Sequence, residues 1–174
     1  LTVLISQAYQ EGQILGRPLL RRDWIQAKSQ GLIALSGGRN GEVGQHLVAG
    51  RPQEAVTALQ WWMSLFPDRY YLELQRTGRE NEEDYLHSAV ELASAENCPV
   101  VATNEVCFLS QDEYDAHEAR VCIGDGRTLN DPRRPRHFSE QQYLRTPDEM
   151  AALFEDIPEA IENTFHIAAR CSTE

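Results

Sequence analysis

The chain has 174 residues, of which 41% are hydrophobic and 25% are charged, and its formal net charge at pH 7 is −11. These values are typical of a globular domain with a real core, and they exclude a disordered or fibrous protein. The acidic surface also argues against strong non-specific binding to nucleic acids, because such binding depends on Lys and Arg side chains that neutralise phosphates.

The cysteines and the start of the chain indicate its setting. The four cysteines show no CxxC spacing, which favours a reducing, cytoplasmic environment. No stretch approaches the ~20 apolar residues of a membrane span, and no signal peptide is visible. Because the chain opens at Leu1 inside a helical pattern and without a Met, we expect it to be a piece of a longer protein.

Three strand–helix units are predicted in chain order. Short apolar runs indicate strands at residues 31–36, 70–75 and 100–103, each followed by a polar loop. Helices are expected from Pro52, where proline suits a first turn, and after an acidic opening at residues 80–84. Later helices are expected at three start signals, namely the capping boxes that begin at Ser110 and Thr146 and the proline at Pro158.

The alternation of strands and helices predicts an α/β fold with parallel strands and short connections. Three units are too few to close an eight-stranded barrel. The chain is therefore expected to form either part of a barrel or a small open sheet. An incomplete barrel leaves open edge strands, from which we expect some pairing with a second copy of the chain.

The loop after the third strand carries the most informative side chains. Asn104, Glu105 and Cys107 follow that strand, and the carboxyl end of a parallel strand is where ligands and metals are normally bound. Glu105 and Cys107 alternate along an extended segment, so both can point to one face and contribute to a zinc site. The alternative is that Cys107 is a buried packing residue, because no second or third ligand is near in sequence.

Two further residues are candidates for a site. Glu73 lies in the middle of an apolar strand, so an inward-facing carboxylate needs a partner there, such as Arg76 or Arg79. We interpret Glu73 either as half of a structural ion pair or as a site residue. His117 lies on the next helix and is interpreted either as a ligand or general base, or as a partly exposed helix histidine.

Two loops are candidates for contact with a ligand or partner. The glycine-rich loop at residues 36–41 lacks the Lys-Ser/Thr ending of a P-loop, and its glycines are expected to form a tight turn beside a site. The segment 131–137 is basic, contains two prolines and is expected to expose Arg133, Arg134 and Arg136. These arginines are expected to contact an acidic partner surface, a neighbouring domain or a nucleic acid.

Ordered sequence blocks along the whole chain carry a resemblance to a known family. They include LSGGR at 35–39, LEL at 72–74, VATN at 101–104 and DAHE at 115–118. The chain resembles the PHP (polymerase and histidinol phosphatase) domain of the bacterial DNA polymerase III alpha subunit, in its proteobacterial branch. This implies a partial TIM-like, seven-stranded βα barrel, with residues 1–137 as the C-terminal part of the barrel and 138–174 as a helical extension toward the polymerase core.

Active PHP domains hold a metal cluster at the carboxyl ends of their strands and hydrolyse phosphoesters, and the resemblance implies where those ligands would lie in this chain. Gly38 stands where metal-binding polymerases have a Cys, and Glu105 and Cys107 stand where the family has Asp and His. The family's first His-x-His motif is not in this sequence. Together with Glu73 and His117, these positions are expected to form a degenerate site.

The resemblance therefore implies a non-catalytic scaffold that docks the proofreading exonuclease (epsilon) subunit and supports the other replicase subunits. No cofactor is expected in this segment, and the Mg²⁺-dependent nucleotidyl transfer of the parent DNA polymerase belongs to another domain. The alternative is a residual metal-dependent phosphoesterase or 3′–5′ exonuclease that uses Zn²⁺ or Mn²⁺. A third interpretation is a DNA-contacting module formed by residues 133–137.

Overall fold

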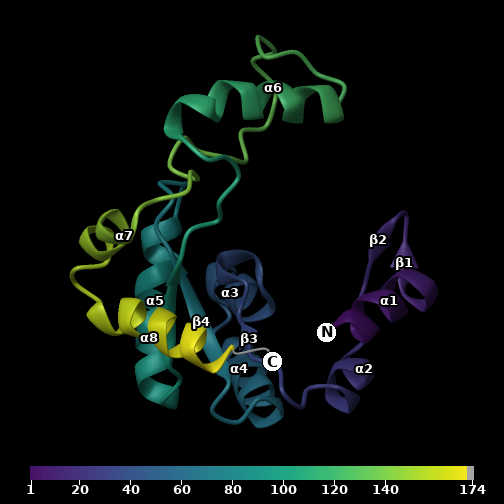
Figure 1. Ribbon diagram of the computed structural model, residues 1–174, viewed down its shortest axis with the longest axis vertical. Coiled ribbons are helices and arrows are strands. Elements are labelled where there is room, and N and C mark those ends of the chain that lie inside the picture. The colour runs from purple at the N-terminus through teal and green to yellow at the C-terminus, as the bar shows by residue number, and fades with distance from the viewer. Residues whose placement is uncertain (172–174) are drawn as a thin grey trace.

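Three parallel strands, in the order β3–β4–β5, form the central sheet of the computed structural model, which describes residues 1–171 (Figure 1). The strands are β3 (Ala34–Leu35), β4 (Tyr70–Gln75) and β5 (Val100–Thr103). Their parallel pairing confirms the predicted α/β class. Within the described residues the sheet is open and closes no barrel, so the partial barrel expected from the resemblance is not confirmed.

Helices cover the face of the sheet that carries the leucines of β4. Leu72 and Leu74 of β4 belong to two apolar clusters that the helices complete. Glu73 and Gln75 alternate with these leucines and therefore project from the opposite face. The helices involved are α3 (Glu42–Val48), α4 (Pro52–Leu65), α5 (Glu82–Glu96), α7 (Pro147–Leu153) and α8 (Pro158–Arg170).

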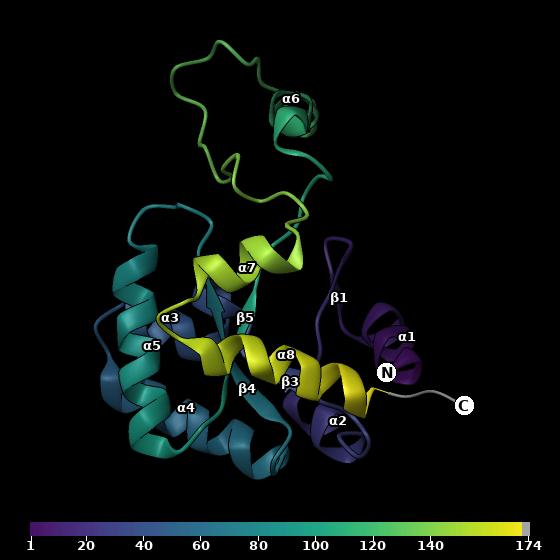
Figure 2. The same ribbon diagram turned by 60° about the vertical axis from the view of Figure 1, so that its left-hand side comes forward.

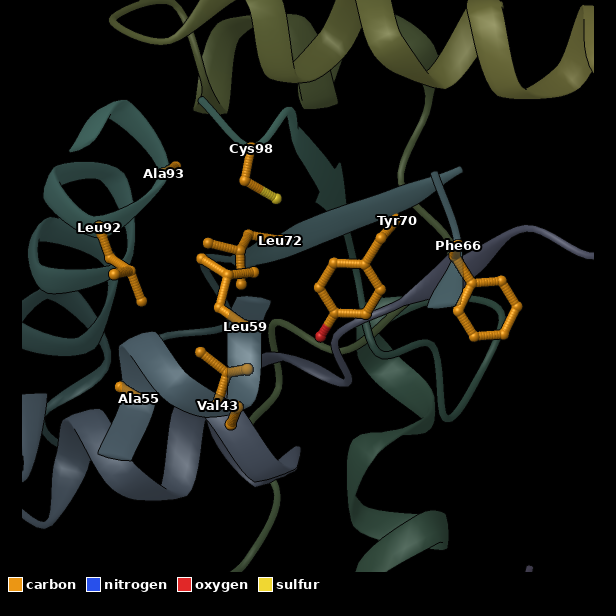
Figure 3. Close-up of a cluster of buried hydrophobic side chains, with 10 residues drawn as sticks. Val43, Ala55, Leu59, Phe66, Tyr70, Leu72, Leu92, Ala93 and Cys98 are labelled. Carbon is orange, nitrogen blue, oxygen red and sulfur yellow. The ribbon is translucent and has the colours of Figure 1, made fainter. Parts of the chain in front are cut away.

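The first apolar cluster joins α3, α4 and the end of α5 to β4 (Figure 3). Leu59 and Leu72 are fully buried at its centre. Trp62 stacks on Tyr70 with ring centroids 5.9 Å apart. This cluster confirms that α4 follows Pro52 and ends just before Pro67, as the helical spacing of its apolar residues predicts.

The second apolar cluster attaches the C-terminal helices to the sheet. Phe154, which follows α7, is fully buried among residues of β4, β5 and α5. Arg76 stabilises the turn between α7 and α8. Its guanidinium lies over the Phe154 ring and forms a bidentate ion pair with the Asp156 carboxylate. Asn163 of α8 donates a hydrogen bond of 2.8 Å to the Val100 carbonyl and so covers part of an edge of β5.

The first part of the chain lies beside the sheet and contains an element that the sequence pattern did not predict (Figures 1 and 2). It comprises α1 (Thr2–Glu11), β1 (Gln13–Ile14), β2 (Arg17–Pro18) and α2 (Arg22–Ala27). The opening helix is confirmed. The β1–β2 hairpin turns at Leu15 and Gly16, both with positive φ, and its two-residue strands are too short to show an alternating pattern.

One helix stands away from the sheet in both ribbon views (Figures 1 and 2). This helix is α6 (Tyr114–Gly124), which follows a short 3-10 turn, η2 (Gln111–Glu113). Both predicted capping boxes, at Ser110 and Thr146, are present. The boundary between 137 and 138 stays a prediction, and the end of that second region, 172–174, lies outside the described residues. No helix within residues 1–171 is long and apolar enough to cross a membrane.

Candidate functional site

The polar face of the sheet is built around the carboxylate of Glu73. One carboxylate oxygen accepts hydrogen bonds from the Thr103 hydroxyl at 2.5 Å and the Gln75 amide at 3.3 Å. The other accepts from the Gly37 backbone N–H at 3.0 Å. The Glu73 backbone N–H in turn donates to the Ser36 hydroxyl oxygen. Glu73 thus ties together the carboxyl ends of β3, β4 and β5.

This geometry corrects the partner expected for Glu73. The sequence suggested Arg76 or Arg79, but Arg76 pairs with Glu83 and Asp156, and Arg79 pairs with Glu82 and Glu105. The reason is the strand register, which places the Thr103 hydroxyl of β5 within reach of the carboxylate on β4. Hydroxyl, amide and backbone donors satisfy the half-buried carboxylate without a counter-ion.

The glycine-rich loop after β3 forms the predicted tight turn. Gly37 and Gly38 both have positive φ, 78° and 55°, a conformation that glycine adopts without steric cost. A Cβ atom at Gly38 would lie 2.9 Å from Oε1 of Gln75. The space for a side chain at this ligand position is therefore taken by the Gln75 amide.

Arg79 is the centre of the site. Its guanidinium contacts four side-chain oxygens from four residues: Nε donates to the Thr77 hydroxyl at 2.9 Å, and Nη2 donates to the Gln75 amide oxygen at 3.2 Å. Nη2 also lies 3.4 Å from Oε1 of Glu82, and Nη1 lies 2.7 Å from Oε2 of Glu105. We call these five residues, together with Glu73, the Arg79 network.

Glu82 is the most deeply buried charge of the Arg79 network, with a side chain only 4% exposed. Its carboxylate accepts hydrogen bonds from the backbone N–H groups of Thr77 and Gly78 and from the Thr77 hydroxyl. The acidic opening of α5 was predicted on the basis of the helix dipole. In the structure Glu82 also folds back onto the turn that follows β4, which fixes the position of Arg79.

Glu105 and Cys107 do not share one binding face. The Glu105 carboxylate forms an ion pair with Arg79, whereas the Cys107 thiol lies 3.7 Å from the side-chain amide of Gln142. Gln142 is fully buried. Its backbone carbonyl accepts a hydrogen bond from the Cys107 backbone N–H, and its side-chain amide donates one to the Glu105 backbone carbonyl. Burial, and then the charge of Glu105, raises the pKa of the Cys107 thiol, which disfavours the thiolate that zinc requires.

His117 belongs to a separate cluster on α6. The side chain is buried rather than partly exposed, and its ring packs against Phe108 and Phe138. Its Nδ1 faces the guanidinium of Arg120 at 3.2 Å. Burial, followed by the Arg120 charge, lowers the pKa of His117. Within residues 1–171, none of its ring or hydrogen-bond partners belongs to the Arg79 network, so the structure shows no contact between His117 and Glu73 or Glu105.

The three predicted contact arginines separate into two kinds. Arg133 has a side chain that is 87% exposed, and Arg136 is also exposed. The expected exposure is wrong for Arg134, which forms an ion pair with the buried carboxylate of Glu118. A buried carboxylate is costly without a counter-charge, so Arg134 is held inside the α6 region.

A cavity of about 610 Å³ adjoins the Arg79 network and brings two predicted positions to one place. Glu105 and Arg136 both line it, with Arg39, Arg79 and His137. The cavity lies between the turn after β4 and the chain segment that returns from α6. Glu80 lines it as well, so three arginines and two glutamates nearly balance on its wall, in contrast to the acidic chain as a whole.

The residues present do not fit the metal cluster that the PHP resemblance implies. Gly38 offers no side chain, His117 belongs to the α6 cluster, and Glu105 is engaged by Arg79. Among residues 1–171, no group of three or more His, Cys, Asp and Glu side chains is arranged to hold a metal ion. The site is instead a hydrogen-bonded network around a guanidinium.

Sequence reasoning missed the central role of Arg79 and its partners Gln75, Thr77 and Glu82. One local signal was available, because Arg79 and Glu82 are three residues apart at the start of a helix, a spacing typical of ion pairs. The contact between Arg79 and Glu105 had no such signal, since it depends on how the loop after β5 lies beside the turn after β4.

Comparisons with known proteins agree with the resemblance seen in the sequence. Residues 1–77 match the PHP domain family. Over 174 residues the chain is 55% identical to the DNA polymerase III subunit alpha of Pseudomonas aeruginosa, covering 100% of the chain and 15% of that protein. Over 172 residues it is 54% identical to the same subunit of Escherichia coli strain K12 and 49% identical to that of Vibrio cholerae. These two matches cover 99% of the chain and 15% of each protein.

The chain spans about 15% of the length of these relatives. The first 77 residues of the chain therefore match the PHP domain family, and the chain is similar, along its whole length, to a segment of the DNA polymerase III alpha subunit.

Proposed function

We propose that this chain is a non-catalytic PHP segment of a replicative DNA polymerase alpha subunit, and that it acts as a scaffold for protein docking. The parent protein would carry out Mg²⁺-dependent, DNA-directed DNA synthesis in the cytoplasm through residues outside this chain. The open parallel sheet would be part of a PHP-type barrel. The similarity to alpha subunits in several proteobacteria supports this assignment of the parent protein.

The observation that carries the non-catalytic role is the state of the carboxylates at the carboxyl ends of the strands. Glu73 is satisfied by Thr103, Gln75 and Gly37, and Glu105 is paired with Arg79. Carboxylates that are already engaged by protein hydrogen-bond donors or by a resident cation are poor starting points for metal coordination. The predicted ligand positions therefore serve structure, and the site stabilises the loops that surround it.

The alternative function is a residual metal-dependent phosphoesterase or 3′–5′ exonuclease that uses Zn²⁺ or Mn²⁺. The cavity beside Glu105 favours it, because Arg39, Arg79 and Arg136 line that cavity and could contact a phosphate group, although Glu80 also lies there. The raised pKa of the Cys107 thiol and the separate position of His117 disfavour it. We therefore rank the scaffold role first.

The proposed partner is the proofreading exonuclease subunit, and the proposed contact is the exposed basic surface at Arg133 and Arg136. Both side chains are exposed: Arg133 makes one long ion pair of 3.5 Å with Asp131, whereas Arg134 is held in a buried pair with Glu118. On an acidic protein, such a local basic surface favours an acidic partner surface and raises the association rate. The same surface is the proposed contact if DNA or another replicase subunit binds here, and a second copy of this chain is a further proposed partner.

The test measures the affinity of the full-length alpha subunit for the proofreading exonuclease subunit by isothermal titration calorimetry. The variant Arg133→Ala/Arg136→Ala is compared with Arg17→Ala/Arg51→Ala, which removes two exposed arginines elsewhere. We expect the Kd to be at least tenfold larger for the first variant and unchanged for the second. Equal affinity of the two variants would refute this docking surface, and the absence of binding by the unmodified protein would refute the docking role.

A further inference from the structure

We propose that the guanidinium of Arg79 is the resident cation of this site and takes the place that a metal ion would otherwise fill. The inference rests on the proposed non-catalytic function and explains what holds the site together. Arg79 would act as a positioning residue, since it fixes Glu105 and the turn after β4 without any contact to reacting atoms.

The oxygen atoms around Arg79 are of the kind that bind hard cations. They come from two carboxylates, one amide and one hydroxyl, contributed by Glu82, Glu105, Gln75 and Thr77. Carboxylate, amide carbonyl and hydroxyl oxygens are the ligands preferred by Mg²⁺, Ca²⁺ and Mn²⁺. Here each oxygen faces a guanidinium nitrogen at 2.7 to 3.4 Å.

The site needs a positive charge because two carboxylates meet there. Glu82 is held in place independently of Arg79, by the backbone N–H groups of Thr77 and Gly78. The Glu105 backbone is held by the side chain of Gln142, and its carboxylate lies 2.7 Å from Nη1 of Arg79. Like charges confined near one another repel strongly when they are partly buried, so a cation between them stabilises both.

Arginine suits this role better than lysine. The guanidinium presents five N–H donors in a rigid plane, and the contacts use all three of its nitrogens in different directions. Its side chain is only 14% exposed, and an arginine stays charged under such burial. A lysine ammonium is a compact point charge and would reach only some of the four oxygens.

The proposal predicts that removing Arg79 creates a vacant cation site. The experiment uses the full-length alpha subunit and counts bound Mn²⁺ by electron paramagnetic resonance in wild type, Arg79→Ala and Arg79→Ala/Glu105→Gln. We expect Arg79→Ala to bind one more Mn²⁺ than wild type, and the double variant to lose it. Arg39→Ala is the control, because Arg39 lines the same cavity but, among residues 1–171, donates to the Glu80 carbonyl and to no carboxylate, and it should gain no Mn²⁺.

A second measurement keeps the proposal testable if Arg79→Ala folds poorly. The melting temperature of the full-length alpha subunit should fall in the order wild type, Arg79→Lys, Arg79→Gln, since lysine keeps the charge and glutamine removes it. Added Mn²⁺ or millimolar guanidinium should raise the melting temperature of Arg79→Ala and leave that of wild type unchanged. Equal losses for lysine and glutamine, or no extra Mn²⁺ in a folded Arg79→Ala protein, would overturn the proposal.

Failure of this inference is distinguishable from failure of the proposed function. If Arg79 is not the resident cation, the Arg79→Ala protein gains no metal while the wild type still lacks phosphoesterase activity. If the non-catalytic role is wrong, the wild type itself binds stoichiometric metal through Glu105 and hydrolyses phosphoesters.

Discussion

Glu82→Gln should destabilise the chain by about 3 kcal/mol. The substitution keeps the shape of the side chain but removes its charge, and Arg79 then loses its most buried partner. Removing one partner of a buried ion pair costs ~3–5 kcal/mol. We place the effect at the lower end of this range because Arg79 keeps Glu105 and because glutamine can still accept from Thr77.

The assay is urea unfolding of the chain, followed by the fluorescence of its three tryptophans. With a slope of ~2 kcal/mol per molar urea, the expected loss lowers the unfolding midpoint by ~1.5 M. The matched control is Glu80→Gln, which removes one exposed charge two residues away and should change stability by less than ~0.5 kcal/mol. A midpoint shift no larger for Glu82→Gln than for Glu80→Gln would refute the structural role of the Arg79 network.

Three further predictions concern other parts of the fold. Phe154→Ala should cost ~3–5 kcal/mol in urea unfolding, because the side chain is fully buried where the C-terminal helices meet the sheet; a loss below 1 kcal/mol would contradict that packing. Thr146→Ala should cost ~1 kcal/mol by thermal unfolding, since it removes the N-cap of α7, and Thr146→Ser should retain most of the stability. The pKa of His117 is lowered in the folded chain, so the unfolded chain binds the proton more readily and stability should fall as pH drops below about 6.5. His117→Phe should make this decline shallower between pH 7 and pH 5, and an unchanged slope would show that His117 does not contribute.

The sequence predicted the local elements of the fold well because their signals are local. The strand Tyr70–Gln75 and the helices after Pro52 and Pro158 were all predicted from apolar spacing and proline positions. Both capping boxes were predicted from residues three positions apart. The hairpin at Leu15 and Gly16 was missed, because strands of two residues leave no alternation to detect.

The sequence indicated which residues are candidates for a site but not their interactions. Glu73 lies within β4 and Glu105 follows the carboxyl end of β5. Their partners come from other loops, and no spacing in the sequence shows that the Thr103 hydroxyl reaches Glu73 or that Arg79 reaches Glu105. Tertiary packing decides these contacts, and it also places His117 in an aromatic cluster away from them.

The metal content of the full-length alpha subunit tests the central claim most directly. Wild type and Glu105→Ala are incubated with Zn²⁺ or Mn²⁺, dialysed and measured by plasma mass spectrometry, with Glu80→Ala as the matched control. A non-catalytic site built around Arg79 predicts the same metal content for all three proteins. A stoichiometric metal ion that is present in wild type, is lost only in Glu105→Ala and disappears together with a phosphoesterase activity would contradict the account.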